Sequence, residues 1–444
     1  MKRSGFAMGV VAVASLLAAE PRVTSQWPQF RGPSGQGVSA EKGFPDDWSP
    51  SRNVAWKTPI PGRGHSSPVV WGDRIFLTTA IEGDVVPGAK GVVHIIEGHP
   101  YVHPQGVGDD HRQTFKVLAI DARDGKIAWE RTAYEGLPYD TRHKKGSFAS
   151  QTPITDGKLL WTYFGSEGLL FTYDMAGNLK WKASLGGIKT VGVGVGTSPV
   201  LYKDLLILQC DEDNGDKSFV VALDKRTGKE VWRTPRKTQV SWATPVLMRA
   251  GNRDELVTSG TEWIIAYAPA TGKELWRAKG LESNAVPSPV VAGDIVVLSA
   301  GYPAKMAMAI RAGGTGDVTG TPRILWRFEK GTAYVPSPIA YDGLVYLVTD
   351  KGILTCLDAK TGEVKYEGGR VPVPATLMAS PVAFEGKILL SSMEGDTFVI
   401  RAGPVHEVIR TNTIGEAIAA SPALAGGRIY IRGESNLYAI GAGS

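Results

Sequence analysis

The sequence predicts an all-β fold, a single eight-bladed β-propeller of four-stranded antiparallel blades. Three observations predict it. A Ser/Thr-Pro dipeptide begins a β-rich run eight times, most runs end in a turn followed by an aromatic residue, and the two chain ends carry complementary parts of one blade. The 444 residues include 54 glycines and 28 prolines, as many short strands joined by turns require.

Eight prolines mark the repeat. After a first interval of 85 residues, successive prolines are 41 to 49 residues apart, which is about the length of one four-stranded propeller blade. Eight starts therefore predict eight blades. The prolines are Pro68, Pro153, Pro199, Pro245, Pro289, Pro338, Pro381 and Pro422.

Most repeats end in a strand with an aromatic residue, which we expect to dock against the neighbouring blade. In residues 198–233 the third strand ends in Ala-x-Asp, a Thr-Gly turn follows, and the last strand carries the tryptophan. A large flat indole fills the wedge between blades and donates its N–H to backbone. The repeat ending near Ile409 lacks both signals. The predicted docking residues are Trp56, Trp129, Trp181, Trp232, Trp276, Trp326 and Tyr366.

The chain ends predict how the ring closes. The last repeat begins at Ser421 and has residues for only three strands, whereas residues 53–59, NVAWKTP, resemble an outer strand. An N-terminal strand that completes the last blade removes an exposed sheet edge. We therefore expect residues 26–52 to form an extended N-terminal segment and residues 53–444 to form the propeller.

The same residues carry a family resemblance. The pattern Ala-x-Asp-x-x-Thr-Gly-Lys-x-x-Trp, complete in residues 222–232, resembles the repeat of the quinoprotein alcohol dehydrogenase-like superfamily. Within it, the chain is most similar to the pyrroloquinoline-quinone-like propeller repeat proteins, which include the propeller subunit of the outer-membrane barrel-assembly machinery. The resemblance covers nearly everything from Trp27 to the end, and it implies a fold more than a function.

Residues 1–25 are predicted to be a secretory signal peptide. Lys2 and Arg3 precede an apolar run from Phe6 to Ala19, which is shorter than the roughly 20 residues that span a bilayer, so a membrane anchor is the weaker alternative. No cysteine near the cleavage site provides a lipid anchor. We expect a periplasmic or secreted protein without a transmembrane segment after cleavage. The net charge of +5, without a Lys/Arg-rich tract, does not indicate nucleic acid as a partner.

An insertion, residues 82–114, lengthens the loop between the second and third strands of the first blade. Four histidines lie in it and two more fall in inter-blade loops predicted on the same face. Imidazole suits zinc, copper or iron, so a metal site is one interpretation and a solvated His-rich loop is the other, because no pair has the spacing of a recognised site. The six candidates are His65, His94, His99, His103, His111 and His143.

Two further groups of residues have the chemistry of possible sites. Asp211 and Asp213 begin an acidic run in a second-to-third-strand loop, where oxygen ligands suit Ca²⁺ and a plain hairpin turn fits as well. Cys210 and Cys356 are far apart and have no partner at metal or redox spacing, so we expect them to be small apolar residues on strands.

Three functions stay open. The first is a non-catalytic, monomeric scaffold of the cell envelope that binds an envelope protein or a glycan through its loop face, with no cofactor. The second is a quinone-dependent dehydrogenase of alcohols or sugars that uses pyrroloquinoline quinone with Ca²⁺, although no catalytic Asp with a calcium-binding Glu and Asn can be assigned. The third is a metal-dependent hydrolase or lyase that holds a transition metal in the His-rich insertion. No catalytic residue is predicted.

Overall fold

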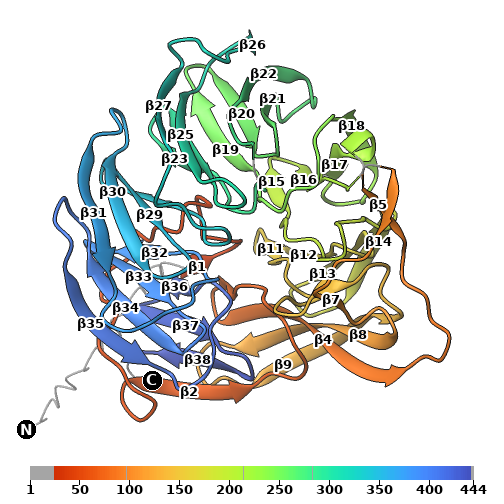
Figure 1. The fold of residues 1–444 in the computed structure, drawn as a ribbon. Coiled ribbons are helices and arrows are strands. Elements are labelled where there is room, and N and C mark those ends of the chain that lie inside the picture. The colour runs from red at the N-terminus through yellow and green to blue at the C-terminus, as the bar shows by residue number, and fades with distance from the viewer. Residues whose placement is uncertain (1–24, 97, 214, 283, 442–444) are drawn as a thin grey trace, which may run out of the picture.

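Eight sheets form a closed ring in the computed structural model, which describes residues 25–96, 98–213, 215–282 and 284–441 (Figure 1). The all-β, eight-bladed fold is confirmed. All of the predicted signal peptide except Ser25 lies outside the described residues. Among the described residues, no helix has the length and apolar character needed to cross a membrane.

Four antiparallel strands, ordered from the central channel to the rim, form the core of each blade. Blade 1 contains β3 (Val69–Trp71), β4 (Arg74–Val85), β8 (His111–Asp121) and β9 (Ile127–Gly136). Blade 2 contains β11 (Ile154–Thr155), β12 (Leu159–Phe164), β13 (Leu169–Asp174) and β14 (Leu179–Ser184). Blade 3 contains β15 (Val200–Tyr202), β16 (Leu205–Cys210), β17 (Phe219–Asp224) and β18 (Glu230–Pro235). Blade 4 contains β19 (Val246–Ala250), β20 (Arg253–Thr258), β21 (Trp263–Tyr267) and β22 (Glu274–Lys279).

The other four blades follow the same order. Blade 5 contains β23 (Val290–Ala292), β24 (Ile295–Ala300), β25 (Met306–Arg311) and β27 (Ile324–Phe328). Blade 6 contains β28 (Ile339–Tyr341), β29 (Leu344–Val348), β30 (Ile353–Asp358) and β31 (Val364–Arg370). Blade 7 contains β32 (Val382–Phe384), β33 (Lys387–Ser391), β34 (Asp396–Arg401) and β35 (Val408–Thr413). Blade 8 contains β36 (Ala423–Ala425), β37 (Arg428–Arg432), β38 (Asn436–Ile440) and, outermost, β2 (Val54–Pro59).

The predicted closure is present in blade 8. The N-terminal β2 pairs antiparallel with the C-terminal β38, and Trp56 lies opposite Ala439. Strand composition follows position in the blade. Middle strands such as β16 and β17 are covered on both faces by neighbouring blades and are nearly all apolar, whereas outer strands such as β18 alternate between exposed and partly buried residues.

The Ser/Thr-Pro dipeptides form a belt around the channel. In seven successive junctions, the backbone N–H of the Ser or Thr in one blade donates to the hydroxyl of its counterpart in the next, at 2.9 to 3.1 Å. The belt runs through Ser67, Thr152, Ser198, Thr244, Ser288, Ser337, Ser380 and Ser421. The hydroxyl in the repeat signature therefore joins each blade to the next at its inner edge.

Indoles join the blades farther out. In five blades the tryptophan Nε1 donates to a backbone oxygen in the turn between the third and fourth strands of the next blade, at 3.0 to 3.2 Å. The donor and acceptor pairs are Trp56 and Ala122, Trp129 and Met175, Trp181 and Lys225, Trp232 and Pro269, and Trp326 and Ala359. The turn glycine lies against the same indole. At Gly228, for example, φ is +73° and an added Cβ would lie 2.6 Å from the Trp181 ring, so the turn needs glycine for both reasons.

Two of the predicted docking residues make other contacts. Trp276 is fully buried and donates to the Glu255 carboxylate at 2.8 Å, and the third and last strands of blade 5 are joined by a longer connection than the short turn of the regular blades. A short strand from blade 5, β26 (Gly316–Asp317), pairs in parallel with β22 at the same joint. At the joint between blades 6 and 7, the Tyr366 hydroxyl has no hydrogen-bond partner in the described part of the chain. The Tyr346 hydroxyl accepts the Gly403 N–H at 2.7 Å there.

The N-terminal segment, residues 26–52, crosses the face that carries the first-to-second-strand turns, which we call the turn face. Its strand β1 (Gln26–Trp27) pairs with the inner edge of β3. The buried Arg31 donates to Pro338 O at 2.8 Å, and Val38 bridges to Ala383. Trp48 is buried in the cluster shared by blades 7, 8 and 1, where the repeat has no docking aromatic residue.

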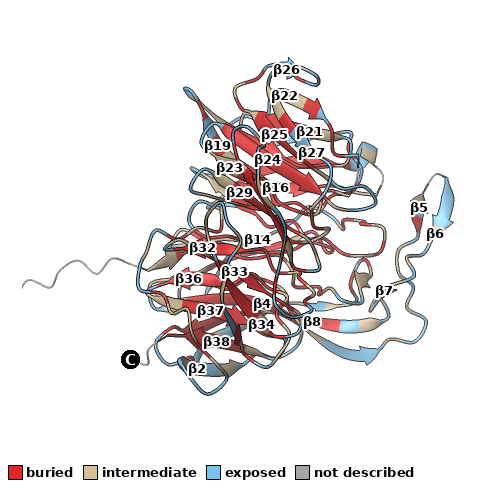
Figure 2. Ribbon diagram, turned by 60° about the vertical axis from the view of Figure 1, so that its left-hand side comes forward, coloured by how far each residue is buried: buried red, intermediate tan, exposed pale blue. Residues whose placement is uncertain are grey.

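The insertion extends from blade 1 on the opposite face, which we call the loop face (Figure 2). Strands β4 and β8 continue into the predicted loop and pair as far as Val85 and His111. Beyond them, β5 (His94–Ile96) pairs with β6 (His99–Tyr101), and β7 (Gly106–Val107) pairs with β10 (Arg142–His143) in the connection to blade 2. A 3-10 turn, η1 (Gly215–Lys217), lies in the acidic loop of blade 3.

Candidate functional site

The mouth of the central channel on the loop face forms a cavity of about 520 Å³. Its wall is mostly apolar and includes Trp242, Tyr302, Tyr334 and Met378. The mouth continues into the channel, a cavity of about 230 Å³ bordered by the Ser/Thr belt. The residues that line both cavities include Val193, Trp242 and Met378. Pockets of this size, with an apolar wall and a few polar groups, are typical of binding sites.

The aromatic side chains of the mouth are held in fixed orientations. The Trp242 Nε1 donates to Gly194 O at 2.7 Å, in the Gly-rich stretch that follows blade 2. The rings of Tyr302 and Tyr334 are 5.4 Å apart. The Asp350 carboxylate accepts the backbone N–H groups of Tyr334 and Val335 at 3.0 to 3.2 Å, which fixes that connection between blades. A rigid apolar wall of this kind binds a partner without a large ordering cost.

The channel is closed at the turn face. Phe30 of the N-terminal segment lines the channel cavity, and Gln36 and Arg31 of the same segment bind blades 5 and 6 through Val291 N at 2.6 Å and Pro338 O at 2.8 Å. The N-terminal segment therefore forms the floor of the channel, and the mouth on the loop face is the open end.

Three polar residues of the insertion sector form part of the rim. His103 and His143 line the mouth with their rings 6.0 Å apart, and the His143 Nε2 contacts the Gln105 Oε1. Burial lowers the pKa of both histidines from the ordinary value, and each also feels a neighbouring histidine. The rim histidines are therefore neutral at neutral pH.

His94 fastens the insertion to the ring. Its Nδ1 lies 2.8 Å from Asp213 Oδ2 and its Nε2 lies 3.0 Å from Asp140 Oδ1, and all three side chains are buried or nearly so. The hydrogen bonds to Asp140 and Asp213 raise the pKa of His94 to about 9 against the effect of burial. Both ring nitrogens carry a proton in this state, so His94 here is a cation between two carboxylates.

Asp211 belongs to a second buried ion pair beside the mouth. Its Oδ1 lies 3.3 Å from Arg236 Nε, and its Oδ2 accepts Gln209 Nε2 at 2.8 Å and the Ser241 hydroxyl. Burial raises the pKa of Asp211, while Arg236 opposes that change. This pair links the acidic loop of blade 3 to the connection between blades 3 and 4.

The remaining candidate histidines lie apart from these. His99 is exposed on β6, His111 contacts the neighbouring Asp110 at 2.7 Å, and His65 lines the channel and a small cavity beside it. The structure therefore joins His94 to Asp213 and His103 to His143, and separates the other three histidines. Within the described ranges, no group of three or more His, Cys, Asp or Glu side chains is placed to hold a metal ion. Cys210 and Cys356 are buried and free, on β16 and β30.

Reasoning from the sequence missed the aromatic wall of the mouth. Trp242 and Tyr334 each come from a connection that leads into a Thr-Pro or Ser-Pro start, and Tyr302 comes from a hairpin of blade 5. The position of Trp242 and Tyr334 just before a repeat start could have indicated the wall, because the connections between blades all lie on the loop face.

A family model described as the outer membrane protein assembly factor BamB matches the chain in three overlapping segments, residues 99–235, 216–316 and 313–444. The chain belongs to this family. Among solved structures, BamB from Moraxella catarrhalis is similar over 82% of this chain and 97% of its own, with 15% identity and a TM-score of 0.53. Quinohemoprotein alcohol dehydrogenase from Comamonas testosteroni is similar over 94% of this chain and 81% of its own, with 12% identity and a TM-score of 0.59. At these identities the likeness concerns the fold alone.

A curated relative matches a smaller part. Tetrathionate hydrolase from Acidianus ambivalens is 34% identical over 116 residues, which is 22% of this chain and 22% of that protein. The chain therefore matches about a fifth of the length of this relative.

Proposed function

We propose that this protein is a non-catalytic propeller of the cell envelope that binds a segment of a partner protein in the mouth of its channel. The observation that carries the proposal is the mouth itself, an open cavity of about 520 Å³ whose wall is apolar and aromatic. A cavity with an apolar wall and a few polar groups is typical of a binding site, and tryptophan and tyrosine provide much of the binding energy in protein interfaces.

The rim and the floor support a protein segment as the occupant. Lys145 and Lys351 on the rim place positive charge beside the apolar wall, which favours a segment with acidic residues next to apolar ones. The N-terminal segment forms the floor of the channel at its turn-face end. A side chain or a short loop that enters from the mouth therefore fits better than a long chain that passes through the ring. The family description names a protein assembly factor, and for this reason a protein is favoured over a glycan.

A quinone-dependent dehydrogenase is the alternative raised by the fold of the quinohemoprotein. The residues that line the channel do not fit a calcium-bound quinone, because none of them is an aspartate, a glutamate or an asparagine. Asp350 is the acidic residue lining the mouth, and it already accepts two backbone N–H groups. We expect no dye-linked oxidation of alcohols or sugars after addition of the quinone and Ca²⁺.

Site-specific photocrosslinking tests the proposal. A photoreactive amino acid at Tyr302, which is 58% exposed in the mouth, is expected to crosslink a discrete envelope protein, whereas one at Val231, which is 53% exposed on the outer strand of blade 3, is not. Tyr334→Ala and Met378→Ala in the same chain should weaken the Tyr302 crosslink, and Val231→Ala should leave it unchanged. Equal crosslinks from both positions, or none from the mouth, would show that the mouth is not the binding site.

A further inference from the structure

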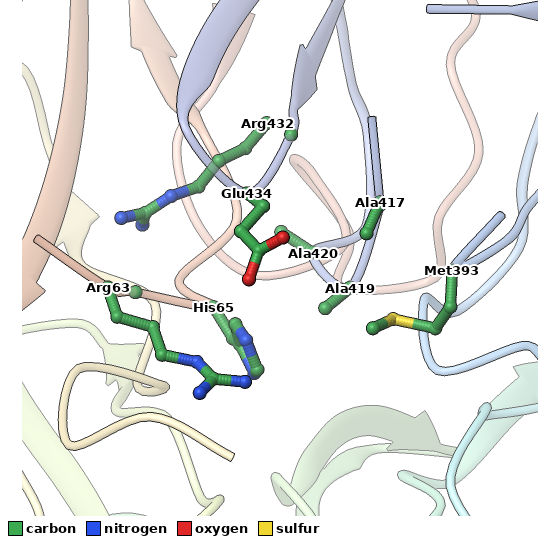
Figure 3. Close-up of a pocket in the computed structure, with 10 residues that line it drawn as sticks. Arg63, His65, Met393, Ala417, Ala419, Ala420, Arg432 and Glu434 are labelled. Atoms are coloured by element: carbon green, nitrogen blue, oxygen red, sulfur yellow. The ribbon is translucent and has the colours of Figure 1, made fainter. Parts of the chain in front are cut away.

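A second, small cavity of about 20 Å³ opens on the loop face where blades 7, 8 and 1 meet. Figure 3 shows Arg63 and His65 side by side on one wall, with the small side chains of Ala417 and Ala419 on the other. His65 and Ala419 also line the central channel, so the small cavity is a side pocket of that channel. Its volume holds one or two water molecules, or the oxygens of one small ionised group.

The walls carry the positive charges of two arginines, and the exposed Glu434 is the acidic residue that lines the cavity with them. Arg432 is only 2% exposed, and its Nη1 donates to Ser66 O, the Ser66 hydroxyl and Thr78 O, all of them neutral acceptors. Arg63 makes no ion pair with any described residue, and its buried Nε has no hydrogen-bond partner among them. Buried charges in proteins are normally paired, so the Arg63 and Arg432 guanidinium groups, which make no ion pair with a described residue, favour an anion in this pocket.

The backbone of residues 63–65 passes close to the Arg432 guanidinium. A Cβ at Gly64 would collide with the Arg432 guanidinium, so glycine is what lets the arginine pass beneath the chain between Arg63 and His65. Burial, followed by the charges of Arg63, Arg432 and Arg142, lowers the pKa of His65 to about 3. His65 is therefore a neutral imidazole that donates one N–H, and no described residue accepts it.

We propose that this pocket binds an anionic oxygen group, a carboxylate or a sulfur or phosphorus oxoanion, between the side chains of Arg63 and His65. The guanidinium supplies charge and two donors, the imidazole supplies a neutral donor, and the alanines leave room for the oxygens. The pocket differs from the apolar mouth in its residues and in its chemistry, so an anion occupies it whether or not a protein enters the mouth.

Glu434 sets the affinity of the pocket. Its exposed side chain enters the cavity opposite His65 (Figure 3), and it makes no ion pair with the described residues. A negative charge at this position repels an incoming anion, so removal of the charge strengthens binding while removal of the Arg63 charge weakens it. These opposite signs separate a built site from a general attraction to a basic surface.

Calorimetric titration of the purified chain with sulfate, phosphate and acetate, each at constant ionic strength, tests the inference. We expect saturable binding of at least one of the three with one site per chain, and the preferred probe distinguishes a carboxylate site from an oxoanion site. Arg63→Gln should weaken binding by about tenfold or more and Glu434→Gln should strengthen it several-fold. Arg226→Gln, at an exposed arginine on the turn face, is the control and should change nothing.

Three results would overturn the proposal. These are a lack of saturation with all three probes, an equal loss of binding in Arg63→Gln and Arg226→Gln, and weaker binding in Glu434→Gln. The Arg63 side chain makes no hydrogen bond to the described residues, so the variant should keep the wild-type melting temperature, which establishes that the fold is intact.

Discussion

Five joints between blades are alike, and the joint between blades 4 and 5 differs in what the same indole does. At the five joints a tryptophan lies on the glycine of the turn between the third and fourth strands of the next blade and donates to a neutral backbone oxygen. At the joint between blades 4 and 5, the Trp276 indole donates to the carboxylate of Glu255, which also accepts the Gly313 N–H at 3.2 Å and pairs with Arg253 at 2.6 Å. Where a longer connection replaces the short turn of the next blade, a buried charge network fills the joint.

Where the regular contact between a tryptophan and the turn of the next blade is absent, other side chains fill the space between the blades. Trp48 from the N-terminal segment is buried where blade 7 has no docking aromatic residue, and His94 with its two aspartates fixes the insertion, which the repeat does not specify. Regular joints rest on packing and neutral hydrogen bonds, whereas the joint between blades 4 and 5 rests on a buried charge network. The following predictions test that division.

The largest effect is expected from Glu255→Ala. This change leaves the Trp276 indole N–H and the Gly313 N–H without their acceptor and leaves Arg253 unpaired, so we expect the free energy of unfolding to fall by about 3–5 kcal/mol. Guanidinium titration followed by tryptophan fluorescence measures it. Glu262→Ala removes an exposed carboxylate of the same blade, whose ion pair with Lys279 spans 3.4 Å, and should cost at most about 1 kcal/mol. Equal losses in the two variants would contradict the charged joint.

A smaller effect is expected from Gly228→Ala at a regular joint. The alanine must adopt φ +73° and its Cβ would lie 2.6 Å from the Trp181 ring, so strain and overpacking together should lower the free energy of unfolding by about 2–4 kcal/mol. Gly251→Ala is the matched control, because Gly251 has φ +58° and nothing within 4 Å of the added Cβ. It should cost about 1–2 kcal/mol, for the backbone alone. If both variants lose the same stability, the indole does not press on the turn.

The smallest effect, local to the insertion, is expected from pH. Because the pKa of His94 is raised from 6.5 to about 9, its ion pairs with Asp140 and Asp213 are fully present below pH 6.5 and are lost as the pH rises through 9. Hydrogen exchange, corrected for intrinsic rates, should show residues 86–96 losing protection between pH 7 and 10, while the indole joints keep theirs. In His94→Gln the protection of the same residues should be low and independent of pH. Persistent protection of the wild-type insertion at pH 10 would show that the ion pairs of His94 do not hold the insertion to the ring.

The sequence predicted the ring because every blade repeats the same local signals. The Ser/Thr-Pro starts and the pairing of β2 with β38 are both as expected, and the hydroxyl belt explains why the dipeptide recurs. The mouth escaped prediction because it is assembled from single residues of different blades, such as Trp242 and Tyr334, that share no motif. His94 and Asp213 are 119 residues apart, and nothing local in either segment indicates that they meet.

The position of the N-terminal segment has a consequence for how the chain folds. Residues 26–59 are synthesised before the blades, yet they contact blades 5, 6, 7 and 8, and the partner of β2 is β38, the last strand of the ring. Contacts of such long sequence separation form slowly because a large loop must close before they contribute. We therefore expect this segment to dock after the blades that it contacts have formed, and until then one sheet edge of an otherwise formed ring stays unpaired.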